Sequence, residues 1–170
     1  MNNPIQTMFD EHEIISNACD FIENINGLWE SSPLEYSKKV NQLLLFFKEY
    51  SDGFHHHKEE VVLFPALKKC VDFTLTELLD ELEMHHEDFR EYTNEVEEYI
   101  KEKKFESSYR VLQTYSSDLL DHIGAENDEL FVLAESLLDD SELETIYYKF
   151  KDIDIELGVD KKEELESIIV

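Results

Sequence analysis

Two histidines in this chain are each followed four residues later by a glutamate, His55 by Glu59 and His122 by Glu126. On an α-helix, residues i and i+4 lie about 40° apart, so each pair would aim an imidazole and a carboxylate at one point. These ligand types together suit iron, manganese or zinc, and a carboxylate has two oxygens with which it can bridge two metals. The two pairs are therefore candidate halves of one metal site.

The chain also nearly repeats itself around these pairs. The stretch FHHHKEEVVLF aligns with DHIGAENDELF, which places His55 over His122, and DEHEII aligns with MHHEDF, which places His12 over His86. A lone histidine, or one such pair in an acidic sequence, is more often a solvated side chain than a ligand. Four motifs in repeat register are poorly explained by chance. We therefore expect the metal ligands to be His12, His55, Glu59, His86, His122 and Glu126.

The triple histidine leaves a choice of register, because His56 and Glu60 form a second pair with the same spacing. The internal repeat favours His55. With His55 at zero, an α-helix places His56 at about 100° and His57 at about 200°. We expect His56 to flank the site, either as a fifth histidine ligand or as a hydrogen-bonding neighbour, and His57 to face solvent. By the same geometry, His85 would lie at the surface or behind the ligand His86.

Long amphipathic segments position these residues. Apolar residues recur at helical spacing over about 5–27, 34–67, 76–104 and 107–138, and only 4 glycines and 3 prolines interrupt the chain. This pattern predicts an all-α protein, an up-down-up-down four-helix bundle with one or two short extra C-terminal helices. The bundle would occupy residues 1–140. Residues 141–170, divided near Gly158, would form a helical extension packed on the same domain. Ser51 to Gly53 predict a kink or loosening just before His55.

The charge of the chain limits its partners. Forty-one acidic residues against 15 basic ones give a net charge of −26, which would repel nucleic acid and anionic lipid. A hydrophobic fraction of 42% is too high for a disordered acidic chain, so the charge should coat a folded core. The cysteines, Cys19 and Cys70, form no metal-binding or disulfide pattern. Without a leader-like N-terminus or a run of apolar residues long enough to span a membrane, we expect a cytoplasmic protein with no membrane partner.

The motifs as a set resemble the hemerythrin-like, or HHE cation-binding, domain family. The likeness rests on DEHEIISNACDFIE around His12, FHHHKEEVVLFPAL around His55, HEDFREY from His86 and HIGAENDELFVLA from His122. It extends into the tail, where FKDIDIELGVDKKEE is similar to the helix that follows the bundle in many bacterial and archaeal members. A ferritin-like site is a poorer match, since it needs two Glu-x-x-His motifs and only Glu83 to His86 forms one.

The resemblance implies a non-haem centre of two iron ions, oxo- or hydroxo-bridged. It implies that Glu59 and Glu126 bridge the irons, that His12 and His55 serve one iron, and that His86 and His122 serve the other. Zinc or manganese are alternative metals. Oxygen-carrying hemerythrins have a fifth histidine in a His-x-x-x-His motif on the third helix. Here Leu82 and Arg90 flank His86 at that spacing, so reversible O2 carriage would require His56 in that place.

Three functions remain open from the sequence. The favoured one is a metal-binding protein that binds O2 or NO, or senses redox state, with O2, NO or peroxide as its small ligand. The second is a di-iron enzyme that turns over peroxide or NO or repairs iron centres; a repair protein of this kind usually has an additional cysteine-bearing N-terminal segment. The third is storage of iron or zinc. We expect a protein that is not an enzyme, while its protein partners stay unassigned.

Overall fold

The computed structural model describes residues 3–170, and all regular secondary structure in that range is helical. The all-α class is therefore confirmed. Four long rods follow one another along the chain. The first is α1 (Pro4–Asn24), and the third is α5 (Thr76–Lys101). The second rod runs through α3 (Pro33–Phe46), η1 (Phe47–His56), η2 (Glu59–Leu63) and α4 (Phe64–Lys69). The fourth runs through α6 (Phe105–Ala125), η3 (Glu126–Leu130) and α7 (Phe131–Leu137).

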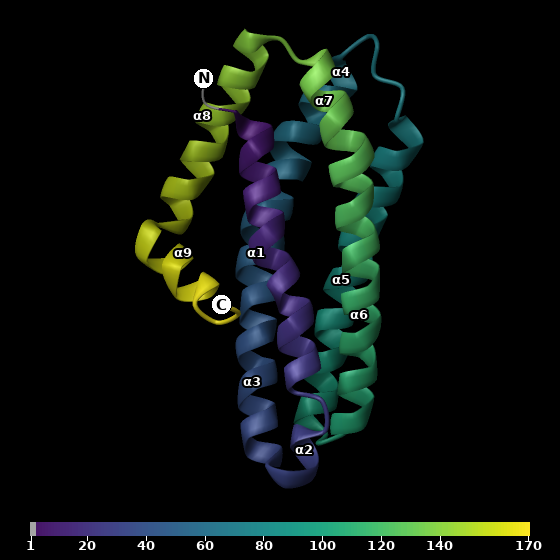
Figure 1. The fold of residues 1–170 in the computed structure, drawn as a ribbon, viewed down its shortest axis with the longest axis vertical. Coiled ribbons are helices and arrows are strands. Elements are labelled where there is room, and N and C mark those ends of the chain that lie inside the picture. Colours follow the sequence, from purple (N-terminus) through teal and green to yellow (C-terminus); the bar gives the residue numbers. More distant parts are fainter. Residues whose placement is uncertain (1–2) are drawn as a thin grey trace.

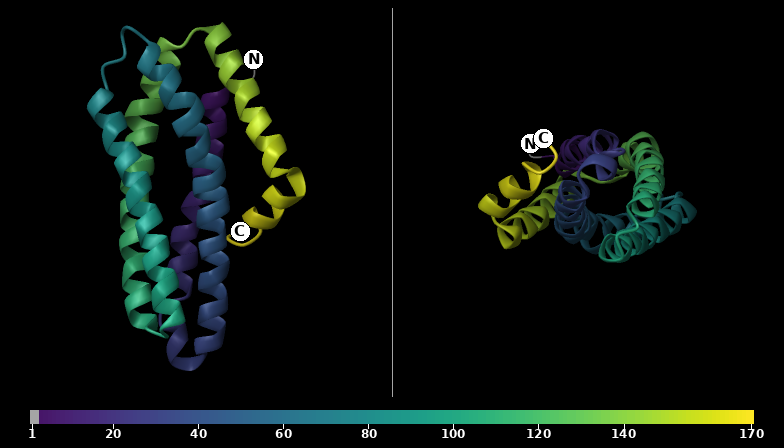
Figure 2. Two further views of the ribbon diagram at one scale, coloured as in Figure 1. Left: turned by 180° about the vertical axis from the view of Figure 1, so that it is seen from behind. Right: turned by 90° about the horizontal axis from the view of Figure 1, so that it is seen from below.

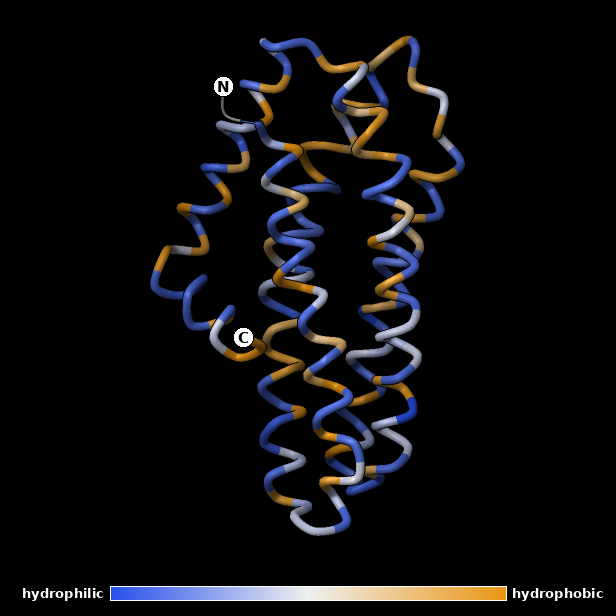
Figure 3. The backbone as a smooth tube through the Cα atoms, in the orientation of Figure 1, coloured by the Kyte–Doolittle hydropathy of each residue, from blue (hydrophilic) through white to orange (hydrophobic). Residues whose placement is uncertain are grey.

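The four rods lie side by side around a common interior (Figures 1 and 2). The connection through the short α2 (Leu28–Ser31) and the turn between α5 and α6 lie together at one end of the molecule. Hydrophobic and hydrophilic residues alternate along each rod (Figure 3), as expected for helices with one buried face. The interior is rich in stacked rings, including Phe47 on Tyr115 at 4.0 Å between ring centroids and Phe46 on Tyr50 at 4.9 Å.

Three segments of the second and fourth rods, η1, η2 and η3, are π-helical. They carry His55, Glu59 and Glu126, whereas His122 lies on α6 just before η3. A π-turn closes i→i+5 hydrogen bonds and is wider than an α-turn, so successive side chains point in more similar directions. The irregularity expected near Ser51 to Gly53 is thus present, as a wide helical stretch from Phe47 to His56 that continues the rod.

The C-terminal part forms α8 (Asp140–Leu157) and α9 (Val159–Glu166), which pack along α1 and the second rod (Figure 2). Asp139 begins α8 with a capping box closed by Glu142. Gly158 separates the two helices with φ of 85°, a left-handed conformation that glycine adopts readily. The expected break near Gly158 is confirmed. The division into a domain of 1–140 and an extension of 141–170 stays a prediction.

None of the helices described in residues 3–170 combines the length and apolar character needed to cross a membrane.

Candidate metal centre

All seven residues singled out for metal binding come together in the interior of the four rods. The first rod contributes His12, the second His55, His56 and Glu59, the third His86, and the fourth His122 and Glu126. None of these side chains is more than 3% exposed. Burying so many ionisable groups is costly unless they are paired or bind a metal.

The seven residues divide into two clusters of four that share Glu59. One cluster consists of His12, His55, Glu59 and Glu126, with its ligand atoms all within 4.8 Å of one another. The division keeps His12 with His55, as the resemblance implied.

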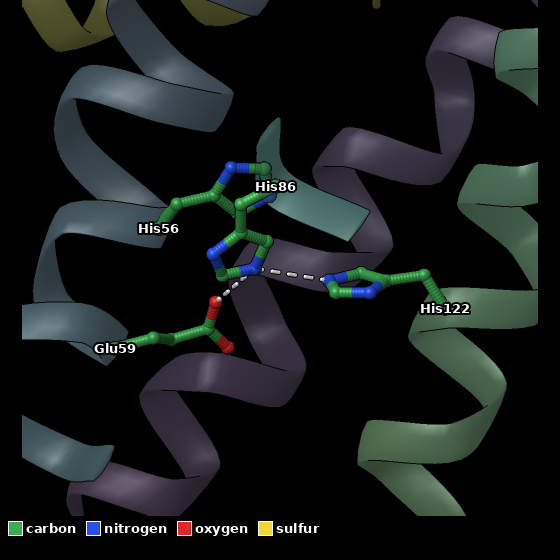
Figure 4. Close-up of side chains that lie close together, drawn as sticks. All are labelled: His56, Glu59, His86 and His122. Carbon is green, nitrogen blue, oxygen red and sulfur yellow. Dashed lines mark hydrogen bonds and ion pairs between the residues drawn. The ribbon is translucent and has the colours of Figure 1, made fainter. Parts of the chain in front are cut away.

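The second cluster consists of His56, Glu59, His86 and His122 (Figure 4). The Nε2 atoms of His86 and His122 approach to 3.2 Å. The ring of His56 stacks on that of His86, with 3.8 Å between centroids and 11° between planes. Here too the implied pair, His86 with His122, stays together. His56 adds a third imidazole to it.

Both glutamates lie between the two clusters. The two oxygens of Glu59 point to opposite sides, with Oε1 3.5 Å from Nε2 of His55 and Oε2 3.4 Å from Nε2 of His86. Oε2 of Glu126 is 3.2 Å from Nε2 of His12 and 3.4 Å from Nε2 of His122. Each carboxylate therefore contacts one histidine from either side, which is the placement a bridging ligand requires.

The polar atoms at the centre fit a bound metal better than a network of hydrogen bonds. Within the described residues 3–170, both oxygens of Glu59, both oxygens of Glu126 and Nε2 of His55 are buried without a hydrogen-bond partner. Such orphaned groups cost on the order of 1–3 kcal/mol each. Five nitrogen and oxygen donors left unpaired in one place are the donor set that iron, manganese or zinc takes.

Burial shifts the protonation of the cluster toward neutral groups. It lowers the pKa of His55 to about 3, and it lowers the pKa of His12, His56 and His122 as well. Burial also raises the pKa of Glu126 to about 7. Four of the five rings therefore present neutral imidazoles at pH 7, which is the form that binds metal.

His86 is the exception. Burial alone would lower its pKa, but the carboxylates of Glu59 and Glu60, the latter accepting a hydrogen bond from Nδ1, outweigh burial and raise the pKa to about 10. At neutral pH the metal-free ring is consequently protonated on both nitrogens and carries a positive charge. A metal ion binding at Nε2 would have to displace that proton.

A second layer of polar residues holds the other nitrogen of each ring. Nδ1 of His12 lies 2.7 Å from Oδ1 of Asn127, and Nδ1 of His55 lies 2.9 Å from Oε2 of Glu11. Such partners fix the tautomer and orientation of a metal-binding histidine. Sequence reasoning missed both residues, although each stands next to a predicted ligand in the chain.

Glu11 in turn is held by a buried cation. Nζ of Lys58, fully buried, lies 2.5 Å from Oε1 of Glu11 and 2.7 Å from Oδ1 of Asp154. The ammonium also sits 3.7 Å from the centroid of the Phe54 ring. A chain of contacts therefore runs from α8 through Lys58 and Glu11 to His55. No pattern in the sequence marked this lysine, which lies between three histidines and two glutamates and reads as a surface residue.

Aromatic side chains close the centre from outside. Phe131 stacks on His12 at 5.3 Å and 23°, Phe64 on His86 at 6.0 Å and 15°, and Phe89 meets the edge of His122 at 5.3 Å. These rings exclude water and so strengthen electrostatic interactions within the site.

One surface cavity leads to the second cluster. It has a volume of about 400 Å³, and His56 lines it together with Asp52, Phe89, Arg90 and Tyr115. A small molecule that enters this cavity would come close to His56.

The remaining histidines lie outside the clusters. His57 is exposed, as predicted. His85 is partly exposed, and its Nδ1 lies 3.4 Å from Nδ1 of the ligand candidate His122. Glu60, the alternative partner of His56, does not join either cluster; its Oε1 instead accepts a hydrogen bond from Nδ1 of His86 at 2.7 Å. The assignment of metal ligands itself stays a prediction.

A comparison with protein families matches residues 3–134 to the family described as Hemerythrin HHE cation binding domain. The chain belongs to this family. The match includes all seven candidate residues of the hemerythrin-like centre and ends before α8, so the C-terminal helices lie beyond it. No curated protein and no solved structure gives a significant match. Membership in the HHE family indicates that the protein binds metal cations, and the two clusters contain side chains that could hold one.

Proposed function

We propose that the chain is a non-haem di-iron protein that binds O2 or NO reversibly, or reports redox state through that centre. The observation that carries the proposal is the sharing of Glu59 by two buried clusters, which together offer five imidazoles and two carboxylates. We also infer that the four rods form an up-down-up-down four-helix bundle around the two irons.

His56 is the residue that favours gas binding. The sequence lacks the third-helix His-x-x-x-His motif expected of oxygen-carrying relatives, and His56 lies in the second cluster, where it would make up the missing fifth histidine. One iron would then have three imidazoles and the other two. Iron held in this way would supply redox chemistry and, on the side with fewer imidazoles, a free position for a small ligand.

The surroundings support a small, uncharged ligand. The donor atoms are buried under aromatic rings, which disfavours large or charged ligands at the centre. We propose O2, NO or peroxide as the ligand, with zinc or manganese as alternative metals. A net charge of −26 argues against nucleic acid or an anionic membrane as a partner, and we propose a cytoplasmic location.

The test is elemental analysis of protein purified without added metal, combined with visible spectra under dithionite and after return to air. We expect about two irons per chain and near-ultraviolet bands that bleach on reduction and return with oxygen. One zinc per chain and a featureless spectrum would refute the proposal. Multiple turnovers of peroxide or NO by the iron-loaded protein would instead assign it to the di-iron enzymes.

A further inference from the structure

Arg90 lies on α5 one turn beyond His86, at the edge of the second cluster. Its guanidinium contacts three carboxylates: Asp52 and Glu60 of the second rod, and the exposed Glu87 of α5, which lies 2.6 Å from Nη1. Nε lies 2.9 Å from Oδ1 and 3.1 Å from Oδ2 of Asp52, while Nη2 lies 2.7 Å from Oδ1 of Asp52 and 2.9 Å from Oε1 of Glu60. The planar fork of arginine can hold two carboxylates in this way, whereas the point charge of a lysine cannot.

Each of these carboxylates also contacts a histidine of the second cluster. Oε1 of Glu60 is 2.7 Å from Nδ1 of His86, and Oδ1 of Asp52 is 3.4 Å from Nδ1 of His56. A carboxylate that accepts a hydrogen bond from Nδ1–H fixes the ring and leaves Nε2 free for a metal. Because the two rings are stacked in parallel at 3.8 Å, the orientation of one constrains that of the other.

We infer that Arg90 is a positioning residue for the second metal, because it holds Asp52 and Glu60 where they orient His56 and His86. This inference rests on the proposed function, since it concerns how the second metal is held. It also explains how a histidine of the second rod can serve a metal that otherwise takes its imidazoles from the third and fourth rods. The fork of Arg90 joins the second and third rods at that level.

Arg90, Asp52 and Glu60 together form what we call the clamp, and its exposure to solvent separates this positioning role from a structural one. The side chains of Arg90, Asp52 and Glu60 are 30%, 31% and 29% exposed. Ion pairs with this much access to solvent contribute little to the stability of a fold. Loss of Arg90 should therefore weaken metal binding at one position much more than it destabilises the protein.

The experiment is an anaerobic titration of the metal-free protein with Fe(II) against a competing chelator, for wild type, R90Q and R90K. R110Q is the matched control, because Arg110 also forms an ion pair on a helix surface but is 73% exposed and remote from the clusters. We expect R90Q to weaken one of the two equivalents of iron about 10- to 100-fold, the usual effect of removing a partner of a metal ligand. The other equivalent and the R110Q protein should match wild type.

Three further readings make the result decisive. R90K should leave most of the loss in place, because lysine cannot hold both carboxylates. The melting temperature of metal-free R90Q should fall by no more than about 3 °C. D52A and E60A, which remove one arm of the clamp each, should each reproduce part of the R90Q effect, and they test the inference even where R90Q does not fold.

Unchanged binding of both irons by R90Q, or by both D52A and E60A, would overturn the inference while the proposed function stands. Equal weakening of both equivalents together with a large fall in melting temperature would assign Arg90 a structural role and overturn it too. A wild-type protein that takes up fewer than two metals would refute the proposed function itself and the inference with it.

Discussion

The buried lysine behind the first cluster offers a direct test of how the site is held. Lys58 is fully buried, and its ammonium is paired with Glu11 and with Asp154, whose side chains are only 2% and 18% exposed. The change K58M keeps a side chain of similar length between the rings of Phe54 and Phe150, so it leaves little empty space in the interior. It removes the charge that compensates Glu11.

Breaking a buried ion pair from one side costs about 3–5 kcal/mol, because the remaining charge stays buried without its partner. We expect K58M to lower the free energy of unfolding of the metal-free protein by this amount. The double change K58M/E11Q removes the uncompensated charge as well, and a glutamine at position 11 can still accept from Nδ1 of His55. It should recover about 2 kcal/mol or more of the K58M loss.

The assay is urea unfolding at pH 7 after treatment with EDTA, followed by far-ultraviolet circular dichroism. K149M is the control, because Lys149 is an exposed lysine of α8, and its loss should stay within about 0.5 kcal/mol of wild type. A K58M protein within about 1 kcal/mol of wild type would refute the reasoning, as would a double variant that is less stable than K58M.

Three further outcomes follow from the geometry. Because the pKa of His86 is about 10, metal binding at pH 8 should release about one proton from this ring, and the affinity for metal should fall as the pH is lowered because protons compete for the ring. Calorimetry in two buffers of different ionisation enthalpy measures the proton release. Absence of proton release at pH 8 would contradict the assignment of His86 as a ligand. E59A should lose both metals by elemental analysis because both clusters use Glu59, whereas H122A should keep one; two metals retained in E59A would exclude a shared ligand. H57A should match wild type in metal content and melting temperature, since His57 is exposed, and a loss of metal there would indicate another register.

Much of the architecture could be predicted because it depends on local patterns. The apolar periodicity located the four rods, and Gly158 marked the break before α9. The spacing of His55 and Glu59, repeated at His122 and Glu126, brought ligand types to one helix face, and the structure places all four side chains in the interior. The short helix α2 was not predicted, because four residues carry too little periodicity to stand out from a loop.

The supporting residues could not be predicted because their roles depend on which helices become neighbours. Lys58 pairs with Asp154, far along the chain, and Arg90 pairs with Asp52 across two rods. In a chain with 41 acidic residues, every basic residue has many candidate partners, so no spacing rule selects the pair that forms. The position of His56 was left open for a related reason: angles of an α-helix do not apply within a π-helical segment.

The wide turns of η1 have a consequence for how this gene can change. His55 and His56 serve different clusters from adjacent positions, so the length of the segment Phe47–His56 sets which way each ring faces. Loss of a single codon there would tighten a wide turn toward an α-turn and change the directions in which His55 and His56 face. A substitution at an exposed position such as Lys48 leaves this length unchanged, whereas an in-frame insertion or deletion would alter the directions of candidate ligands of both clusters in one step. Selection on this stretch should therefore act on the number of residues as strongly as on their identity.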